Sequence, residues 1–227
     1  MGSANHKNNT KRITLYFQMI CLIPVFFGMI ACTSIVPVNV NMSKGHPGLN
    51  LTTTSQKLPY DIALVVPDLF SNFSVKSQSD IVNLNYVFEY HIGRDFQETL
   101  PEFFANRFRN LSIIKTEDNL SRFDYVFVPD VSSSWLSTRI YFRRTYPVYS
   151  LQVNLGMTVY EHGKPYAPIN IRESLEKSAP IACRTCSGED VLDQQQIRND
   201  YAALLSQIYS KLDAYITDTF KEALNDK

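Results

Sequence analysis

The sequence predicts an α+β fold, with an antiparallel sheet of about four to five strands and two helices packed on one of its faces. Three observations predict this fold. Apolar residues recur at three- and four-residue steps over 201–220, as in a long helix with one apolar face. Apolar and polar residues alternate over 149–159, as in a strand with one buried face and one face in water. Shorter signals place a strand, a helix and several further strands before that long helix.

The predicted elements begin with a strand and a helix. An apolar run over 61–66, closed by Pro67, predicts a central strand, and weak alternation over 82–90 leaves open a second strand or a long excursion. Between 92 and 109, five apolar positions share one helical face. Pro101 interrupts this helix, which either begins near Thr99, with Pro101 in its first turn, or is kinked at the proline. The five positions are Phe96, Leu100, Phe103, Phe104 and Phe108.

Strand signals dominate the middle of the chain. The segments 111–115, 123–131 and 135–142 follow one another, and the alternating segment 149–159 comes next. His162 and Gly163 then predict a tight turn, so that 166–171 returns as the second strand of a hairpin. The last helix begins near Asn199 or Asp200, unless the preceding run 193–196 is already helical.

The N-terminus has the layout of an export signal. Lys7, Lys11 and Arg12 precede an uncharged apolar run over 13–31, which by length alone could also be a permanent membrane anchor. The run ends in Met29-Ile30-Ala31-Cys32, which resembles the lipobox of bacterial lipoproteins. That resemblance implies that Cys32 is acylated and becomes the mature N-terminus, and that Thr33, in place of aspartate, directs the protein to the outer membrane.

The rival prediction is an uncleaved type II membrane anchor that carries a glycosylated domain. The basic residues before the apolar run would then stay in the cytoplasm. Five triplets beyond the run fit the acceptor pattern for N-glycosylation. These triplets begin at Asn41, Asn50, Asn72, Asn110 and Asn119.

Composition limits what the exported part can be. The 22 basic residues balance the 22 acidic ones, which argues against a nucleic-acid binder. The segment 32–57 is rich in Asn, Ser, Thr, Gly and Pro and predicts a flexible tether from lipidated Cys32. With 1–31 as the signal peptide, the sequence predicts that 58–227 form a single α+β periplasmic domain.

Cys183 and Cys186 are the pair of thiols that could carry chemistry, since Cys21 lies in the signal and Cys32 is assigned to lipid. In an oxidising compartment we expect the two to form a structural disulfide within a polar loop. Their spacing leaves a periplasmic thiol-disulfide oxidoreductase as the alternative, although such an enzyme needs the motif at a helix N-terminus. A metal site would need a second Cys or His pair, which the sequence lacks.

The most distinctive surface motif is Arg139-Ile140-Tyr141-Phe142-Arg143-Arg144. On a strand, Arg139, Tyr141 and Arg143 share one face. Together with Arg144 they could clamp an anionic glycan, a lipid headgroup or the carboxylates of a partner. Apart from the cysteine pair, the sequence has no nucleophile elbow, glycine-rich phosphate loop or clustered histidines, so it predicts no catalytic residue and no cofactor.

The lipobox, the length and the order of elements together resemble small outer-membrane lipoproteins of the YajG and lipopolysaccharide-assembly kind. The resemblance implies an architecture and transfers no functional residue. The sequence therefore predicts a non-enzymatic outer-membrane lipoprotein, anchored on the periplasmic side, that serves as a structural, assembly or accessory subunit of a cell-envelope complex. Its expected partners are the membrane, through the lipid, and envelope proteins; the oligomeric state stays open.

Overall fold

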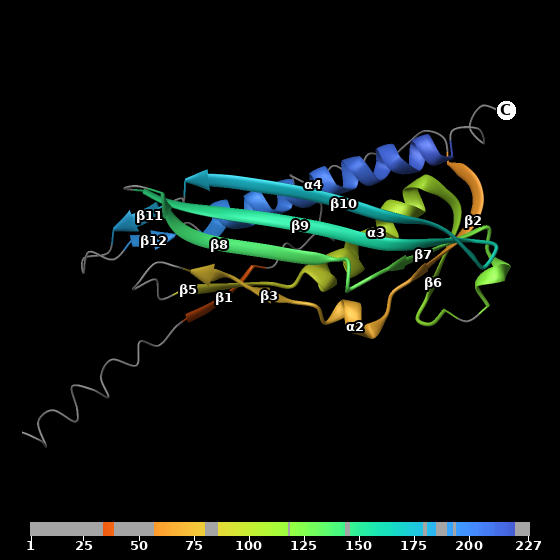
Figure 1. Ribbon diagram of the computed structural model, residues 1–227, viewed down its shortest axis with the longest axis horizontal. Helices are drawn as coiled ribbons and strands as arrows, with labels where there is room; N and C mark the ends of the chain where they lie inside the picture. The colour runs from red at the N-terminus through yellow and green to blue at the C-terminus, as the bar shows by residue number, and fades with distance from the viewer. Residues whose placement is uncertain are drawn as a thin grey trace, which may run out of the picture. The chain divides into compact units, whose positions relative to one another are not determined.

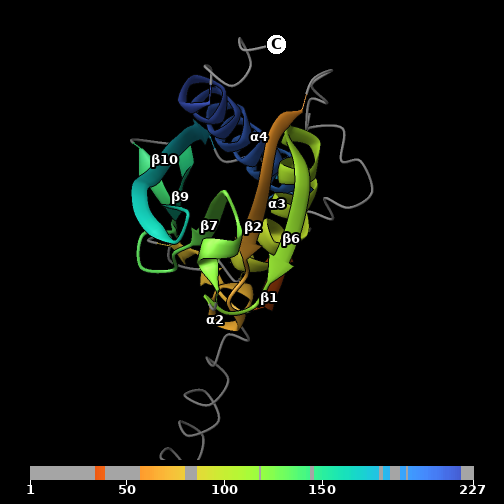
Figure 2. The ribbon, with the colours of Figure 1, turned by 90° about the vertical axis from the view of Figure 1, so that its right-hand side faces the viewer.

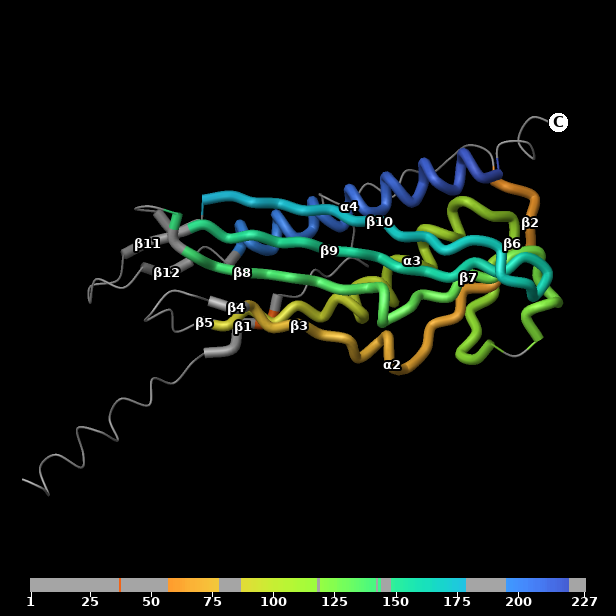
Figure 3. Tube along the Cα trace, in the orientation of Figure 1, coloured from red at the N-terminus to blue at the C-terminus, as the bar shows by residue number. Residues whose placement is uncertain are grey.

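The computed structural model describes residues 34–38, 57–79, 86–117, 119–143, 146–178, 181–184, 190–192 and 194–220 (Figure 3). The chain divides after Ser34 into two units, and the fold described here is that of the second, Ile35–Lys227. In chain order its elements are β1 Ser34–Val38, β2 Leu58–Val65, α2 Asp68–Ser71, β3 Val75–Lys76, β4 Gln78–Ser79, β5 Tyr86–Tyr90, α3 Ile92–Arg107, β6 Phe108–Ile114, η2 Leu120–Arg122, β7 Tyr125–Pro129, β8 Trp135–Arg143, β9 Tyr146–Glu161, β10 Lys164–Ser178, β11 Ile181–Arg184, β12 Asp190–Leu192 and α4 Gln194–Thr219.

The main sheet has seven strands and mixes parallel with antiparallel pairs. β9 is antiparallel to β10 along one edge and to β8 and β7 along the other (Figure 1). β7 then pairs with β2, and β2 with β6, and both pairs are parallel. The expected antiparallel sheet of four to five strands is therefore wrong in its pairing and in its strand number. The cause is the crossover through α3, which returns the chain to β6 in the same direction as β2.

β7 and β8 run in the same direction along one edge of β9, joined by residues 130–134. Pro129 lies opposite Met157 and Trp135 opposite Asn154, so this connection bulges out beside only two residues of β9. Two hydrogen bonds join the connection to β9. The Asp130 N–H donates to the Gly156 carbonyl at 3.0 Å, and the Gly156 N–H donates to Ser134 Oγ at 3.0 Å. A Cβ at Gly156 would lie 1.8 Å from Ser133 Oγ, so the close approach requires glycine.

Helices α3 and α4 pack on one face of the main sheet, as predicted. Their buried side chains form one cluster with Ile62 and Leu64 of β2, Phe127 of β7 and the odd-numbered residues of β9. Figure 2 shows α4 beside β10, and α3 beside β2 and β6. On the opposite face, loop residues around η2 cover a small second cluster. Its buried members are Ala63, Val65, Val126 and Val128.

Helix α3 runs unbroken from Ile92 to Arg107 with Pro101 inside it. Of the two alternatives left open by the sequence, a helix that begins near Thr99 is therefore wrong, and Phe108 belongs to β6. The first two turns hold because Ile92 and Phe96 are fully buried, and burial of such side chains stabilises a helix more than its propensity does. Thr99 Oγ1 donates to the Asp95 carbonyl at 2.7 Å, two residues before the proline.

The other predicted elements are confirmed, with changed boundaries. The strand signals at 61–66, 111–115, 123–131, 135–142 and 149–159 correspond to β2, β6, β7, β8 and β9. The turn at His162 and Gly163 has φ values of 47° and 79°, as a two-residue hairpin turn requires. β10 extends beyond the predicted 166–171 to Ser178, and α4 begins at Gln194, so the glutamine run is helical.

A second, small sheet has three strands in the order β1-β5-β3, and Phe88 and Tyr90 of β5 belong to the main core cluster. It accounts for the weak strand signal over 82–90, of which Tyr86–Tyr90 is β5. It also includes β1, Ser34–Val38, which lies inside the segment 32–57 that the sequence predicts as a tether. The Pro37 carbonyl of β1 accepts a hydrogen bond from Arg198 of α4 at 3.4 Å.

We predict that Gly156→Ala destabilises the fold by about 2 kcal/mol, because the added methyl group must displace Ser133 from a closely packed bulge. The measurement is urea unfolding followed by the fluorescence of Trp135, the single tryptophan. Ser137→Ala, at an exposed position of the adjacent strand, is the control and should change the free energy of unfolding little. Equal stability of Gly156→Ala and the control would contradict the assigned bulge.

Candidate binding surface on the open sheet face

The face of β8 that points away from the helices carries the motif found in the sequence. Leu136, Thr138 and Ile140 are buried toward the helices. The alternate side chains therefore point to the opposite face, as strand geometry requires. Of these, Arg139 and Arg143 are exposed, and Tyr141 is half-buried. The predicted clustering of Arg139, Tyr141 and Arg143 on one face is thus what the structure has; Arg144 lies outside the described residues.

Pairing across β8, β9 and β10 arranges this outer face in rows. Arg139 lies opposite Ser150, and Ser150 lies opposite Glu176. Toward the other end of the strands, Trp135 lies opposite Asn154, which lies opposite Arg172. Three successive strands therefore supply one continuous surface.

The first group on this surface is built around Glu176. Arg143 Nη1 lies 3.1 Å from Glu176 Oε1, with side-chain exposures of 63% and 49%, so a partner could still reach both groups. A hydrogen bond to Glu176 raises the pKa of Tyr141 above its usual value. The Arg139 guanidinium carbon lies 5.8 Å from the centre of the Tyr141 ring. Glu176 thus holds Tyr141 and Arg143 in place while the surface keeps an excess of positive charge.

The second group, around Arg172, was not found from the sequence. The Arg172 guanidinium carbon lies 5.0 Å from the Trp135 ring, and Arg172 Nη2 donates to Gln152 Oε1 at 3.0 Å. Trp135 is half-buried and Arg172 is exposed. The sequence predicts a hairpin strand over 166–171, but it does not give the register of that strand against its neighbour. The register of β10 against β9 places Arg172 beside Trp135.

The bulge at 130–134 borders this second group. Asp130 Oδ1 accepts the Ser132 N–H at 2.9 Å, and Asp130 Oδ2 accepts the hydroxyls of Ser132 and Ser133. The hydroxyl of Ser132 is the main reason that the pKa of Asp130 lies below its usual value. Asn154 Nδ2 donates to the Ser133 carbonyl and, at 2.7 Å, to Asn170 Oδ1. These bonds fix the base of the surface beneath Trp135 and Arg172.

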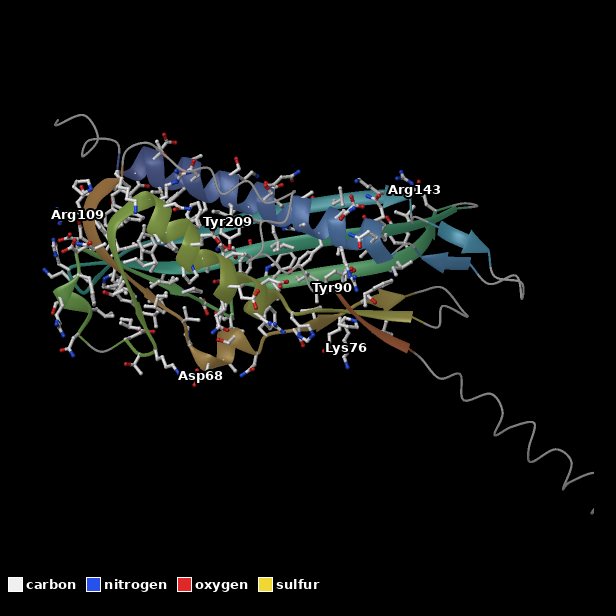
Figure 4. All side chains as sticks on the ribbon, turned by 180° about the vertical axis from the view of Figure 1, so that it is seen from behind. Asp68, Lys76, Tyr90, Arg109, Arg143 and Tyr209 are labelled. Carbon is white, nitrogen blue, oxygen red and sulfur yellow. The ribbon has the colours of Figure 1, made fainter. Side chains whose placement is uncertain are left out.

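The remaining predicted site residues are not tested by the structure. Cys32 and Cys186 lie outside the described residues. Cys183 lies in β11, which pairs with β12, and its side chain is not described. The structural disulfide and the acylation of Cys32 therefore stay predictions. Figure 4 shows Arg143 and Arg109 near opposite ends of the sheet.

Within the described residues, neither a metal site nor a membrane helix adds to this surface. No group of three or more His, Cys, Asp or Glu side chains in the described ranges is arranged to hold a metal ion. None of the helices in these ranges is long and apolar enough to cross a membrane.

The opposite, helix-covered face of the sheet contains a buried polar network. Asp95 of α3 is 3% exposed and accepts a hydrogen bond from the Tyr201 hydroxyl of α4 at 2.9 Å. Burial raises the pKa of Asp95 to about 7, and the Tyr201 bond opposes this shift only in part. Thr99 and Tyr209 form a second hydrogen bond between the same two helices.

Asp200 extends the network from α4 to the sheet. It accepts a hydrogen bond from the Tyr149 hydroxyl of β9, and Lys177 Nζ of β10 lies 2.6 Å from Asp200 Oδ1. Burial is the main cause that raises the pKa of Tyr149, and the Asp200 carboxylate adds to it. Asp200 is thus a buried carboxylate with a cation beside it, whereas Asp95 is hydrogen-bonded by the neutral Tyr201 hydroxyl, and the charges of Glu98 and Arg94 shift its pKa less than burial does. The network joins the two helices to each other and to the sheet.

Comparisons with known proteins give distant structural similarity alone. No protein-family model matches the chain, and no curated protein matches it. It resembles a DUF330-family protein from Xanthomonas campestris, with 8% identity and a TM-score of 0.44 over 85% of this chain and 99% of that one. A minor lipoprotein from Acinetobacter baumannii has 10% identity and a TM-score of 0.42 over 71% and 94% of the two chains.

A third structure is described as a homolog of the neuraminyllactose-binding hemagglutinin, from Helicobacter pylori. It has 14% identity and a TM-score of 0.42 over 77% of this chain and 95% of that one. At these identities and TM-scores, the three structures assign neither a family nor a function to this chain.

We predict that Asp95→Asn removes a pH dependence of stability. Because the folded-state pKa of Asp95 lies above the unfolded value of 3.8, the folded chain holds the proton more tightly. Its contribution to stability is therefore largest below about pH 4 and is lost as the pH rises to about 7. Three pKa units correspond to at most about 4 kcal/mol.

The measurement is the difference in free energy of unfolding between wild type and Asp95→Asn from pH 5 to pH 8. The wild type should lose stability relative to the variant across this range. Asp68→Asn, at an exposed carboxyl, is the matched control. A difference that stays constant with pH would show that Asp95 is ionised throughout.

Proposed function

We propose that the chain is a non-enzymatic lipoprotein of the bacterial cell envelope, anchored through Cys32 in the outer membrane. In this proposal it is a structural, assembly or accessory subunit that binds envelope components through the outer face of β8, β9 and β10. The observation that carries the proposal is the ordered group of Arg139, Arg143 and Arg172, which are exposed on the sheet face that points away from α3 and α4.

The chemistry of the outer face favours an anionic partner. Guanidinium groups form paired hydrogen bonds with carboxylates and phosphates, and they stack on aromatic rings. Here three arginines lie beside Trp135 and Tyr141, and one glutamate partly offsets their charge. Rings and side chains that are already held in place lose little freedom on binding, which favours affinity.

The N-terminal sequence supports the anchor. The basic residues, the apolar run over 13–31 and the lipobox-like ending at Cys32 are the parts that a lipoprotein signal needs. Two or more acyl chains hold a protein stably at a membrane, whereas one gives only marginal binding. An anchored body would meet its partners at the membrane surface, where weak individual contacts act at high local concentration.

The anchor is tested by intact mass and membrane fractionation of wild type and Cys32→Ala in a Gram-negative host. The proposal predicts loss of residues 1–31, added acyl mass and sedimentation with outer membranes for the wild type, and none of these for Cys32→Ala. A full-length, unacylated chain in the inner membrane, unaltered by the substitution, would instead support the type II anchor.

The binding face is tested by replacing Arg139 and Arg143 together with glutamate. Envelope components that co-purify with the wild type after cross-linking should be lost from this variant. Arg109→Glu is the matched control, because Arg109 is also exposed and paired, with Asp61 at 3.0 Å, but lies away from this face. If the double variant keeps the same components as the control, the outer face is not the docking surface.

A further inference from the structure

The free edge of β10 has the properties of a pairing site. Among the described residues, β10 has one partner strand, β9, over a ladder that reaches from Lys164 to Ser178. Its other edge offers backbone N–H and C=O groups that a further strand could bind. The side chains of Glu173 and Lys177 already hold α4, through Lys211 and Asp200.

Pro168 shows which residues direct their backbone groups to the free edge. A proline within a sheet is tolerated where its nitrogen faces away from the paired strand. Pro168 lies within the ladder opposite Thr158, so its nitrogen faces the free edge. Backbone groups alternate between the two edges, and the register is regular from Ala167 to Ser178. The even-numbered residues from Asn170 to Ser178 therefore present their N–H and C=O groups outward.

The proline-free stretch of this edge is centred on Ser174. Pro168 ends it on one side, and Pro180 follows the strand in sequence on the other. Ser174 is midway between the two prolines. An antiparallel second copy centred on Ser174 would therefore use the whole proline-free stretch of both chains.

The charged side chains of β10 on the outer face favour a strand pair with the same centre, Ser174. With Ser174 opposite Ser174 of a second copy, Arg172 of each chain lies opposite Glu176 of the other. Moving the centre by one residue to either side places each of these charges opposite an uncharged residue. Opposite charges in directly facing positions stabilise a strand pair, whereas charges that only protect an edge tend to repel a second copy.

We propose that two copies of this chain associate through β10, antiparallel and centred on Ser174. The main sheets then become one continuous sheet across the dimer. Arg172 of one copy adds to the pair of Arg143 and Glu176 in the other, so the two arginine-rich outer faces form a single surface. This goes beyond the proposed function and does not depend on the membrane anchor.

Cysteine cross-linking of the full chain in detergent tests the geometry. Ser174→Cys should form a cross-linked dimer with a short bismaleimide, above the background of the native cysteines in the wild type. Ser137→Cys, on the same face but within the sheet, and Ser112→Cys, on the edge strand β6, are the exposed controls. Cross-linking of Ser174→Cys no greater than these controls would overturn the proposal.

Charge reversal and proline substitution test the register by sedimentation equilibrium. Glu176→Arg should weaken the dimer roughly tenfold or more, and adding Arg172→Glu should restore it, because both facing pairs are then attractive again. Ser174→Pro should give a monomer of nearly wild-type stability, because it removes only an N–H that points to the free edge. Leu175→Pro is the control: it removes an N–H that faces β9 and should destabilise the fold itself. A monomeric wild type, or a dimer that Ser174→Pro leaves intact, would contradict the proposal.

Discussion

Continuous hydrogen bonding of β9 along both of its edges is the constraint on which the rest of the structure depends. β10 pairs with it from Val148 to Glu161, while β8 and β7 share the opposite edge. The junction between those two strands lies beside Gly156, where Ser134 and Asp130 take over the backbone hydrogen bonds. One strand therefore joins the β8 side of the sheet to the parallel strands β2 and β6.

This arrangement gives the two faces of the sheet different side chains. The odd-numbered residues of β9 enter the core beneath α3 and α4, and within that layer the carboxylates of Asp95 and Asp200 accept hydrogen bonds from Tyr201 and Tyr149. The even-numbered positions face outward with the arginines of β8 and β10. A rigid, doubly paired strand below them gives the arginines and aromatic rings fixed positions, which is what a recognition surface needs. The same geometry leaves the outer edge of β10 for pairing.

Local patterns in the sequence were enough to predict each major strand and both long helices, and the shared face of Arg139, Tyr141 and Arg143. They did not predict the parallel pairing of β2 with β6, because the direction of a strand depends on its crossover and not on its own residues. They also missed Arg172 beside Trp135. The two-residue turn fixes the first pairs of the hairpin, but an irregularity between Pro165 and Ala167 shifts the later register by one residue. Pro101 left the start of this helix open between two alternatives, and the structure decides for the longer helix because burial of Ile92 and Phe96 outweighs the local cost of the proline.

Native-state hydrogen exchange along β9 tests most directly whether this strand unites the sheet. If it does, the amides of 148–161, including that of Gly156 at the junction, should exchange through one opening reaction close in free energy to global unfolding. Separate opening free energies for the halves paired with β8 and with β7, with fast exchange at Gly156, would mean two independently stable sheets and would contradict the account.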